Sequence, residues 1–203
     1  MSDNGVYRLL AYPWLYSFSQ LLLAPGAERT LTKEIKHLLT KLPSAHSILD
    51  VGCGPSSRLW RVGLHPVGLD LSPAYAAAFV NRAGSAVSGS AVALPFPDGS
   101  FDGVWNFGLL HHLPDATAYK AVSEMLRVCR KGGYVVIFDA VMPKSTWQRP
   151  IAYVLRCLDR GGFVRREDEF KTILPPVSHP YVSERITYSF NGLEGLMIYT
   201  LCT

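Results

Sequence analysis

The chain has 203 residues, of which 48% are hydrophobic and 18% charged, and its formal net charge is +4. This balance is typical of one globular domain and excludes a disordered or fibrous protein. The small net charge gives no reason to expect a nucleic-acid partner, and the apolar runs fall short of the ~20 residues that cross a bilayer.

The cysteines are widely scattered: Cys53, Cys129, Cys157 and Cys202. No CxxC pair exists, so we expect neither a metal site nor a disulfide framework. The first residues lack the basic and then apolar pattern of a secretory signal. We therefore expect a reduced, cytoplasmic protein.

Helices and strands alternate in the first half of the chain. Apolar residues between Leu31 and Leu42 recur at helical spacing. Ser72 and Pro73 fit the N-cap and first position of a later helix. The expected elements are helix 31–42, strand 47–51, helix 57–62, strand 67–71 and helix 73–84.

The second half continues the alternation and ends in a strand pair. Lys131–Gly133 is expected to break the chain, and the turn over 191–195 predicts an antiparallel hairpin. The expected elements are strands 86–87 and 101–107, helix 116–128, strand 134–138, helices 146–159 and 167–174, and strands 184–190 and 196–201. The order predicts an α/β fold, a Rossmann-like, doubly wound, mostly parallel sheet of about seven strands with an antiparallel C-terminal hairpin.

A glycine turn follows the first expected strand. Gly52 and Gly54 let the backbone approach a ligand closely, and the helix N-terminus beyond them favours polar ligands. Asp70 closes the second strand at a spacing where an acid binds both hydroxyls of a ribose. Ser56 replaces the third glycine of a dinucleotide site, and the Asp50 carboxylate would repel a pyrophosphate. The charge pattern therefore favours S-adenosylmethionine, a sulfonium, over NAD.

At this point the chain resembles class I S-adenosylmethionine-dependent methyltransferases, in the small-molecule subfamily that includes the ubiquinone and menaquinone biosynthesis enzymes. The resemblance covers about residues 46–140. It rests on five motifs in order, namely Leu49–Gly54, Gly68–Ser72, Leu94–Asp102, Leu110–Asp115 and Leu126–Gly133.

The resemblance also implies the cofactor-binding residues. Glycines 52 and 54 would lie under the methionine portion, Asp50 would reach its amino group, and Asp70 would hold the ribose. The remaining implied contacts come from Cys53 in the turn, Leu71, Ala91 and Val92 beside the adenine, and the backbone of Asn106. Family members often carry an acid where this chain has Ser90–Ala93, so an acid on the adenine side is missing.

Two histidines follow the fourth expected strand. His111 or His112 is a candidate general base, since an imidazole titrates near neutral pH. The alternative interpretation is that one ring anchors the loop. Asp102 is expected to anchor a loop, whereas Asp139 either faces the substrate or simply ends its strand.

We expect a single domain over 1–203, divided into an N-terminal helical lid region (1–45), a cofactor-binding core (46–140) and a basic helix with the strand pair (141–203). The aromatic residues of the first region either pack on the sheet edge or belong to the lid; they are Tyr7, Tyr12, Trp14, Tyr16 and Phe18.

One helical face over 146–159 carries arginines. Arg149, Arg156 and Arg160 fall together, opposite a face of Ile151, Val154, Leu155 and Leu158. The arginine face is either plainly solvated or a surface for an anionic acceptor or an anionic membrane.

The sequence thus predicts methyl transfer from S-adenosylmethionine to a small acceptor, of which an anionic or lipid-like molecule is one candidate class, at an oxygen, nitrogen or carbon atom. The missing adenine-side acid and the short helices keep open a non-catalytic S-adenosylmethionine-binding protein. An NAD-dependent oxidoreductase is the other alternative.

Overall fold

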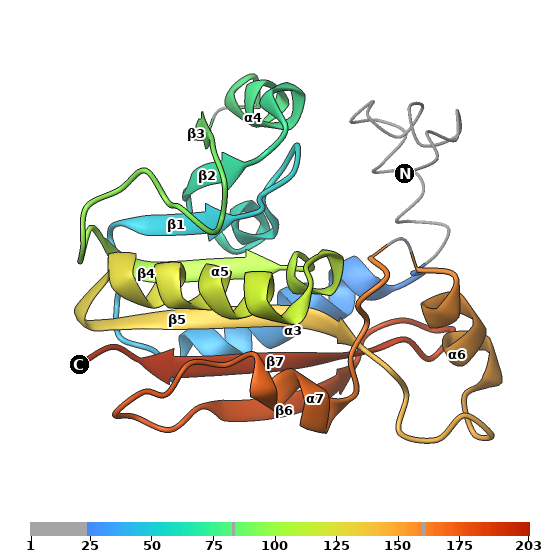
Figure 1. Ribbon diagram of the computed structural model, residues 1–203. Coiled ribbons are helices and arrows are strands. Elements are labelled where there is room, and N and C mark those ends of the chain that lie inside the picture. Colours follow the sequence, from blue (N-terminus) through green and yellow to red (C-terminus); the bar gives the residue numbers. More distant parts are fainter. Residues whose placement is uncertain (1–23, 83, 160) are drawn as a thin grey trace.

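The computed structural model describes residues 24–82, 84–159 and 161–203. They form one seven-stranded sheet in the order β3-β2-β1-β4-β5-β7-β6 (Figure 1). The strands are β1 (Ile48–Val51), β2 (Val67–Asp70), β3 (Ser85–Ser88), β4 (Phe101–Phe107), β5 (Cys129–Val141), β6 (Val182–Thr187) and β7 (Glu194–Leu201). β1 to β5 pair in parallel, and β7 pairs antiparallel with both β5 and β6. The predicted fold class is confirmed.

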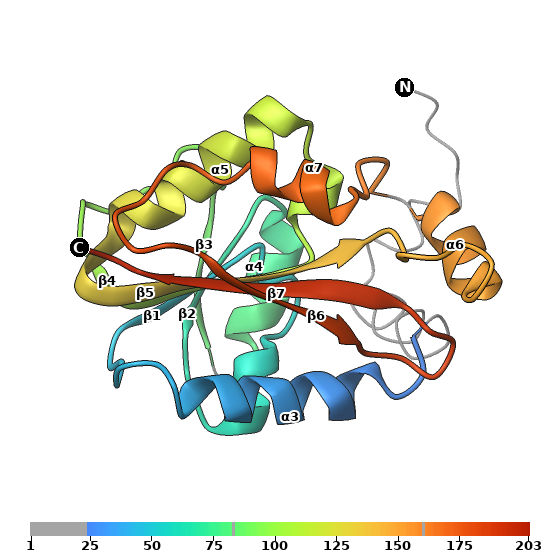
Figure 2. The same ribbon diagram turned by 90° about the horizontal axis from the view of Figure 1, so that it is seen from below.

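Helices cover both faces of the sheet. The helical elements are α3 (Ala27–Leu39), η1 (Arg58–Val62), α4 (Pro73–Val80), η2 (Leu110–His112), α5 (Asp115–Val128), α6 (Pro150–Cys157) and α7 (Glu167–Thr172). Figure 2 shows α5 and α7 on one face and α3 on the other, with α6 at the end of the sheet.

The central strands are buried on both faces, which explains their unbroken apolar sequence. In β5, Val135 and Ile137 pack into the cluster under α5 and α7. Val136 and Phe138 point the other way, into the cluster that holds Leu31, Ile35 and Leu38 of α3. α3 is therefore a layer of the core. A lid role stays a prediction for residues 1–23, which lie outside the described residues together with the five N-terminal aromatic residues.

Local signals place the element ends. Ser72 is the N-cap of α4, where its Oγ accepts a hydrogen bond from Tyr75 N at 3.4 Å, and Pro73 opens the helix, as predicted.

One expected break is wrong. Lys131–Gly133 lies inside β5, because the end of β7 pairs with it: Gly132 N donates to Cys202 O at 2.8 Å, and Cys202 N donates to Gly133 O at 2.9 Å. Gly132 has φ 75°, so the glycines let the strand bend and continue instead of ending it. Only the partner strand, distant in sequence, decides this outcome.

In the part of the chain that the structure describes, no helix is both long and apolar enough to cross a bilayer.

Candidate functional site

The glycine turn after β1 is bound to the neighbouring strand. The backbone N–H groups of Gly52 and Cys53 both donate to Leu69 O, at 2.7 and 3.1 Å. Gly52 and Gly54 have φ of 72° and 61°, a region that L side chains rarely adopt. No atom of the described residues lies within 4 Å of the position that a Cβ on Gly54 would occupy. The turn therefore keeps the space beside it open for a ligand.

Asp70 lies across from this turn at the end of β2. Its Oδ2 accepts from Gly54 N at 2.9 Å, and its Oδ1 accepts from Ser72 N at 2.8 Å. Each carboxylate oxygen keeps a further lone pair, so the group is fixed in place and still able to accept from hydroxyls. This geometry is compatible with the ribose contact that the resemblance implies.

Asp50 precedes the turn and is 2% exposed. Its Oδ2 accepts from Ser57 Oγ at 2.6 Å, while its Oδ1 is buried without a hydrogen-bond partner among the described residues. Burial raises the pKa of this carboxyl to about 6, although the Ser57 hydroxyl and the Arg58 charge oppose the rise. A buried acid with an unsatisfied oxygen fits a cationic ligand group.

A cavity of about 800 Å³ opens beside these residues. Its lining includes the predicted Asp50, Gly52, Cys53 and Gly54, together with side chains that sequence reasoning missed: Glu28, Arg29, Arg58, Trp60, Arg61, Arg82 and Phe107. Glu28 bridges Arg58 at 3.2 Å and Arg61 at 2.8 Å.

The lining of the cavity thus combines carboxylates, Asp50 and Glu28, with several guanidinium groups. This arrangement suits a ligand with both charges, such as an amino acid with a cationic side chain. The arginines were missed because they come from α3, η1 and the end of α4, and only the fold brings these elements together.

The other residues predicted to bind the cofactor, Asp70 included, do not line this cavity. Leu71 follows Asp70 and is 74% exposed, as an apolar surface for a ring would be. Ala91 and Val92 are half-buried against the core. Asn106 is fully buried, and its Nδ2 donates to Val51 O at 2.7 Å, which ties β4 to the end of β1. Their contacts with a cofactor stay predictions.

His111 is held between two acids. Its Nδ1 lies 2.5 Å from Asp139 Oδ1, and its Nε2 lies 3.6 Å from Asp159 Oδ1. Burial of the ring lowers its pKa, but the charge and hydrogen bond of Asp139 outweigh this effect and hold the pKa above its usual value. The backbone carbonyl of His111 also accepts from Phe163 N at 3.1 Å.

These contacts fit the interpretation that one ring anchors the loop, and a catalytic role for His111 or the exposed His112 stays a prediction. Asp139 is fully buried and also accepts from Leu110 N and Ala140 N, at 2.5 and 2.6 Å. Asp102 accepts from the backbone of His46 and Ser47, at 2.6 and 3.0 Å, so its expected anchoring role is confirmed.

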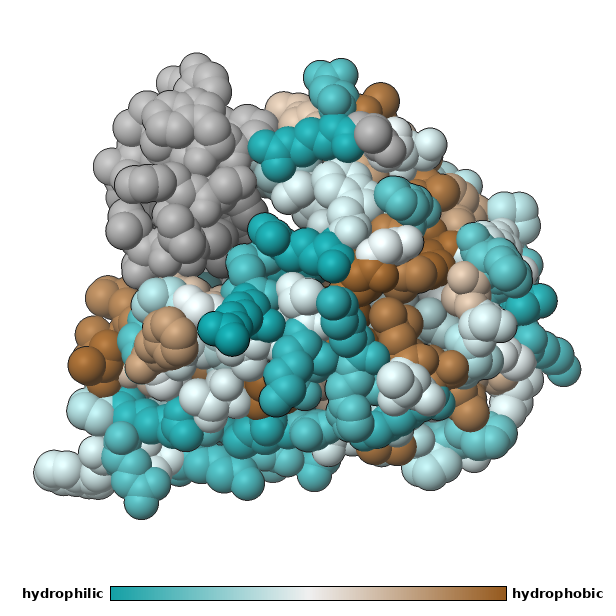
Figure 3. Space-filling model, turned by 180° about the vertical axis from the view of Figure 1, so that it is seen from behind, coloured by the Kyte–Doolittle hydropathy of each residue, from teal (hydrophilic) through white to brown (hydrophobic). Residues whose placement is uncertain are grey.

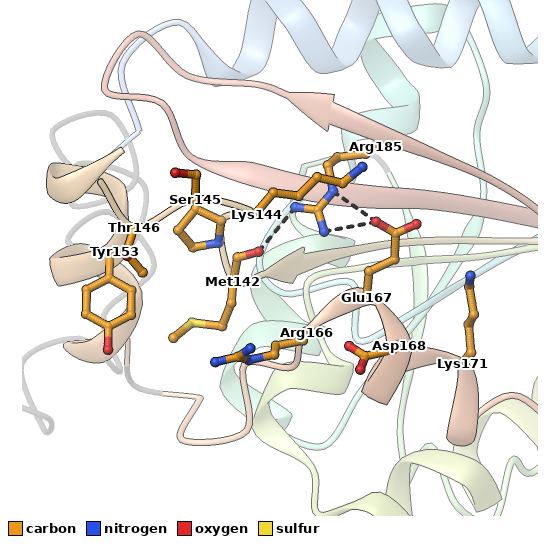
Figure 4. A pocket seen from close by; sticks show the side chains of 11 residues that line it. Met142, Lys144, Ser145, Thr146, Tyr153, Arg166, Glu167, Asp168, Lys171 and Arg185 are labelled. Carbon is orange, nitrogen blue, oxygen red and sulfur yellow. Dashed lines mark hydrogen bonds and ion pairs between the residues drawn. The ribbon is translucent and has the colours of Figure 1, made fainter. Parts of the chain in front are cut away.

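A second cavity, of about 630 Å³, lies between the loop after β5, α7 and β6 (Figure 4). Arg185 crosses it and contacts Glu167 at 3.0 Å and the carbonyl of Met142 at 3.2 Å. Lys144, Arg166 and Lys171 also line it, with Asp168 as a counter-charge. An excess of cations makes this cavity suitable for an anionic group.

The arginine face expected over 146–159 is wrong. Arg156 is 7% exposed, and it donates to Tyr188 Oη at 2.6 Å, to Glu194 O at 2.8 Å and to Asp159 Oδ2 at 3.1 Å. Arg149 donates to Gly192 O at 3.0 Å, and Arg160 lies outside the described residues. Ile151, Val154 and Leu158 are exposed instead, and Leu155 packs on the core, because these internal acceptors fix the arginine side of α6 against the hairpin.

Comparison with known proteins agrees with this geometry. Residues 49–137 match the model of the methyltransferase domain family. The chain is 34% identical over 128 residues to a 2-methyl-6-phytyl-1,4-hydroquinone methyltransferase of Synechocystis sp., covering 56% of this chain and 40% of that protein. It is 27% identical over 203 residues to the 24-methylenesterol C-methyltransferase 2 of Oryza sativa, covering 89% of this chain and 55% of that protein.

The first curated relatives are thus much longer than the part this chain matches, which is about two fifths of their length. Among solved structures, a possible histamine N-methyltransferase of Thermotoga maritima superposes with a TM-score of 0.73 at 16% identity, covering 97% of this chain and all of that one. At that identity the superposition supports the fold alone.

Proposed function

Because the chain belongs to the class I S-adenosylmethionine-dependent methyltransferases, we propose that it transfers the methyl group of S-adenosylmethionine to a small-molecule acceptor. The observation that carries the proposal is the unsatisfied carboxylate oxygen of Asp50 beside the open glycine turn. In an NAD site this acid would face a pyrophosphate, whereas the amino group of the methyl donor satisfies it.

The donor's charges suit the mixed lining of the cavity. Asp50 receives the ammonium group, and an arginine such as Arg29 or Arg58 receives the α-carboxylate. Asp70, fixed on Gly54 N beside the cavity, receives the ribose hydroxyls. When bound, the donor supplies an electrophilic methyl group on sulfur. The residues of this chain orient that group and exclude water from it, which is most of what an in-line displacement requires.

For the acceptor, we propose a small molecule with an anionic group and lipid-like character. The second cavity supports an anionic group through Lys144, Arg166 and Lys171. This second cavity follows β5, which lies two strands from β1 in the sheet. It opens at the same carboxyl edge as the 800 Å³ cavity beside the glycine turn, which we call the donor cavity. The names of the two relatives, a phytylated hydroquinone and a sterol methyltransferase, support a lipophilic acceptor.

Calorimetric titration with S-adenosylmethionine, S-adenosylhomocysteine and NAD tests the donor. We expect both adenosyl ligands to bind and NAD not to bind; preferential NAD binding would overturn the proposal.

Transfer of a labelled methyl group to a panel of anionic and neutral lipophilic acceptors tests catalysis. Paired variants Lys144→Ala and Arg166→Ala should raise KM for anionic acceptors and leave neutral ones unchanged. Donor binding with no turnover on any acceptor would favour the non-catalytic alternative.

A further inference from the structure

The basic charge of the protein is concentrated between residues 141 and 166. This segment contains six basic residues, namely Lys144, Arg149, Arg156, Arg160, Arg165 and Arg166, and a single acid, Asp159. Its formal charge of six minus one, +5, exceeds the +4 of the whole chain, so the rest of the protein is slightly acidic.

Several of these cations are used to orient α6 and the loop that follows it. Arg156 pairs with Asp159 at 3.1 Å, Arg149 lies 3.5 Å from Glu194, and Arg165 lies 2.8 Å from Asp115. Asp159 and Glu194 are therefore largely buried and paired, whereas Asp115 is paired at the surface. Lys144 and Arg166 are exposed, and no described carboxylate lies within ion-pair distance of either side chain.

α6 and the residues at its two ends expose apolar side chains, which we define as the apolar stripe: Trp147, Ile151, Val154 and Leu158. Their exposed fractions are 94%, 63%, 53% and 76%. Ile151 and Val154 share one side of α6 through their spacing of three residues, Trp147 lies in the turn before the helix, and Leu158 is its C-cap. α6 projects at the end of the sheet in Figure 2, and Figure 3 shows apolar side chains gathered at the same end of the molecule.

We propose that the apolar stripe docks on an anionic lipid surface, with Lys144 and Arg166 against the head groups. A projecting helix with an apolar outer side enters the boundary between head groups and acyl chains, and neighbouring cations add attraction to anionic lipids. Lys144 and Arg166, exposed and not paired with a described carboxylate, supply the positive charge that such a surface requires. The internal ion pairs of Arg149 and Arg156 hold the stripe outward. This inference does not depend on the methyl donor or on catalysis.

Flotation of the full chain with vesicles is the first test. We expect binding to phosphatidylcholine vesicles that contain phosphatidylglycerol, little binding to pure phosphatidylcholine, and weaker binding as salt rises. The double variant Trp147→Ser/Leu158→Ser should bind at least about tenfold more weakly, because two large apolar groups no longer enter the lipid. Val182→Ser is the matched control, since Val182 is 46% exposed and starts β6 at the opposite end of the sheet.

Reversing the charges of Lys144 and Arg166 is an independent test of the proposal. Lys144→Glu/Arg166→Glu should reduce binding to the phosphatidylglycerol vesicles by about tenfold or more. Lys41→Glu/Lys131→Glu makes the same change of charge at the opposite edge and should reduce binding much less. Equal effects of the two pairs, or no effect of either the stripe or the charge variants, would overturn the proposal.

Cys157 reports which occupant covers the stripe. It is the exposed cysteine of α6, next to Leu158, whereas Cys53 and Cys129 are buried. We expect fast labelling of Cys157 by a thiol reagent in the free protein, located by mass spectrometry, and slow labelling once phosphatidylglycerol vesicles are added. Slow labelling without vesicles, whether the first 23 residues or a second copy covers the helix, would overturn the proposal.

Discussion

The donor cavity and α6 use charged side chains in opposite ways. Around the glycine turn, Asp50 keeps an oxygen that no residue of the described part of the chain satisfies, and Asp70 is fixed with acceptor capacity to spare, so both are available to a ligand. In α6 the guanidinium of Arg156 meets three acceptors of its own chain, and apolar side chains face outward. The difference teaches that a polar residue becomes functional only where the fold leaves it unsatisfied.

The largest expected effect is the loss of stability on removal of the Arg156 side chain. Arg156→Ala should lower the free energy of unfolding by about 3 kcal/mol, because it leaves Asp159 and the Tyr188 hydroxyl buried without their cation. Arg149→Ala, at a half-exposed position, should cost clearly less. Urea unfolding measures both. If Arg156→Ala left the free energy of unfolding unchanged and weakened vesicle binding, the interpretation of an arginine surface would be restored.

On the donor side, Asp70→Ala should weaken binding of S-adenosylmethionine by about a hundredfold, since two hydrogen bonds to a charged acceptor are lost. Calorimetry checks this, with Asp98→Ala as control, because the Asp98 side chain is 82% exposed and pairs with Arg127. An unchanged dissociation constant for Asp70→Ala would show that this acid does not hold the ribose.

His111 tests the same contrast between the donor cavity and α6, because its ring contacts Asp159 beside α6. His111→Gln should cost about 2 kcal/mol near pH 6, where the ring is protonated and paired with Asp139. Because the pKa of His111 is raised, this stability is fully present below pH 6.5 and is lost as pH rises through the raised value. Thermal unfolding of the wild type and His111→Gln across pH measures it; an equal pH dependence in both proteins would assign it to another group.

The smallest effect is the pH dependence of donor binding. Since the pKa of Asp50 is about 6 in the free protein, a cationic ligand should bind about tenfold more weakly near pH 5 than near pH 7. By the same linkage, Asp50 stabilises the free fold below its unfolded value of 3.8, and this contribution is lost as pH rises through about 6. Asp50→Asn should flatten both dependences; an equally steep titration in that variant would assign them to another group.

The sequence by itself determined the parallel core. The glycine turn, the acid closing β2 and the cap of α4 act through neighbours in the chain, so Gly54, Asp70 and Ser72 were identified from local patterns. The C-terminal hairpin was also predicted, because its turn and its two apolar runs are adjacent in sequence.

Tertiary structure alone decided the rest. Helical spacing separates the two sides of α6 but does not say which side is buried. Arg156 is buried because it donates to Tyr188 and Glu194, and both acceptors lie more than thirty residues away in the sequence. The arginines of the donor cavity and the unbroken course of β5 likewise depend on partners distant in sequence. Local patterns carry no information about such partners, because burial of a charge is favourable only where distant groups supply its hydrogen bonds.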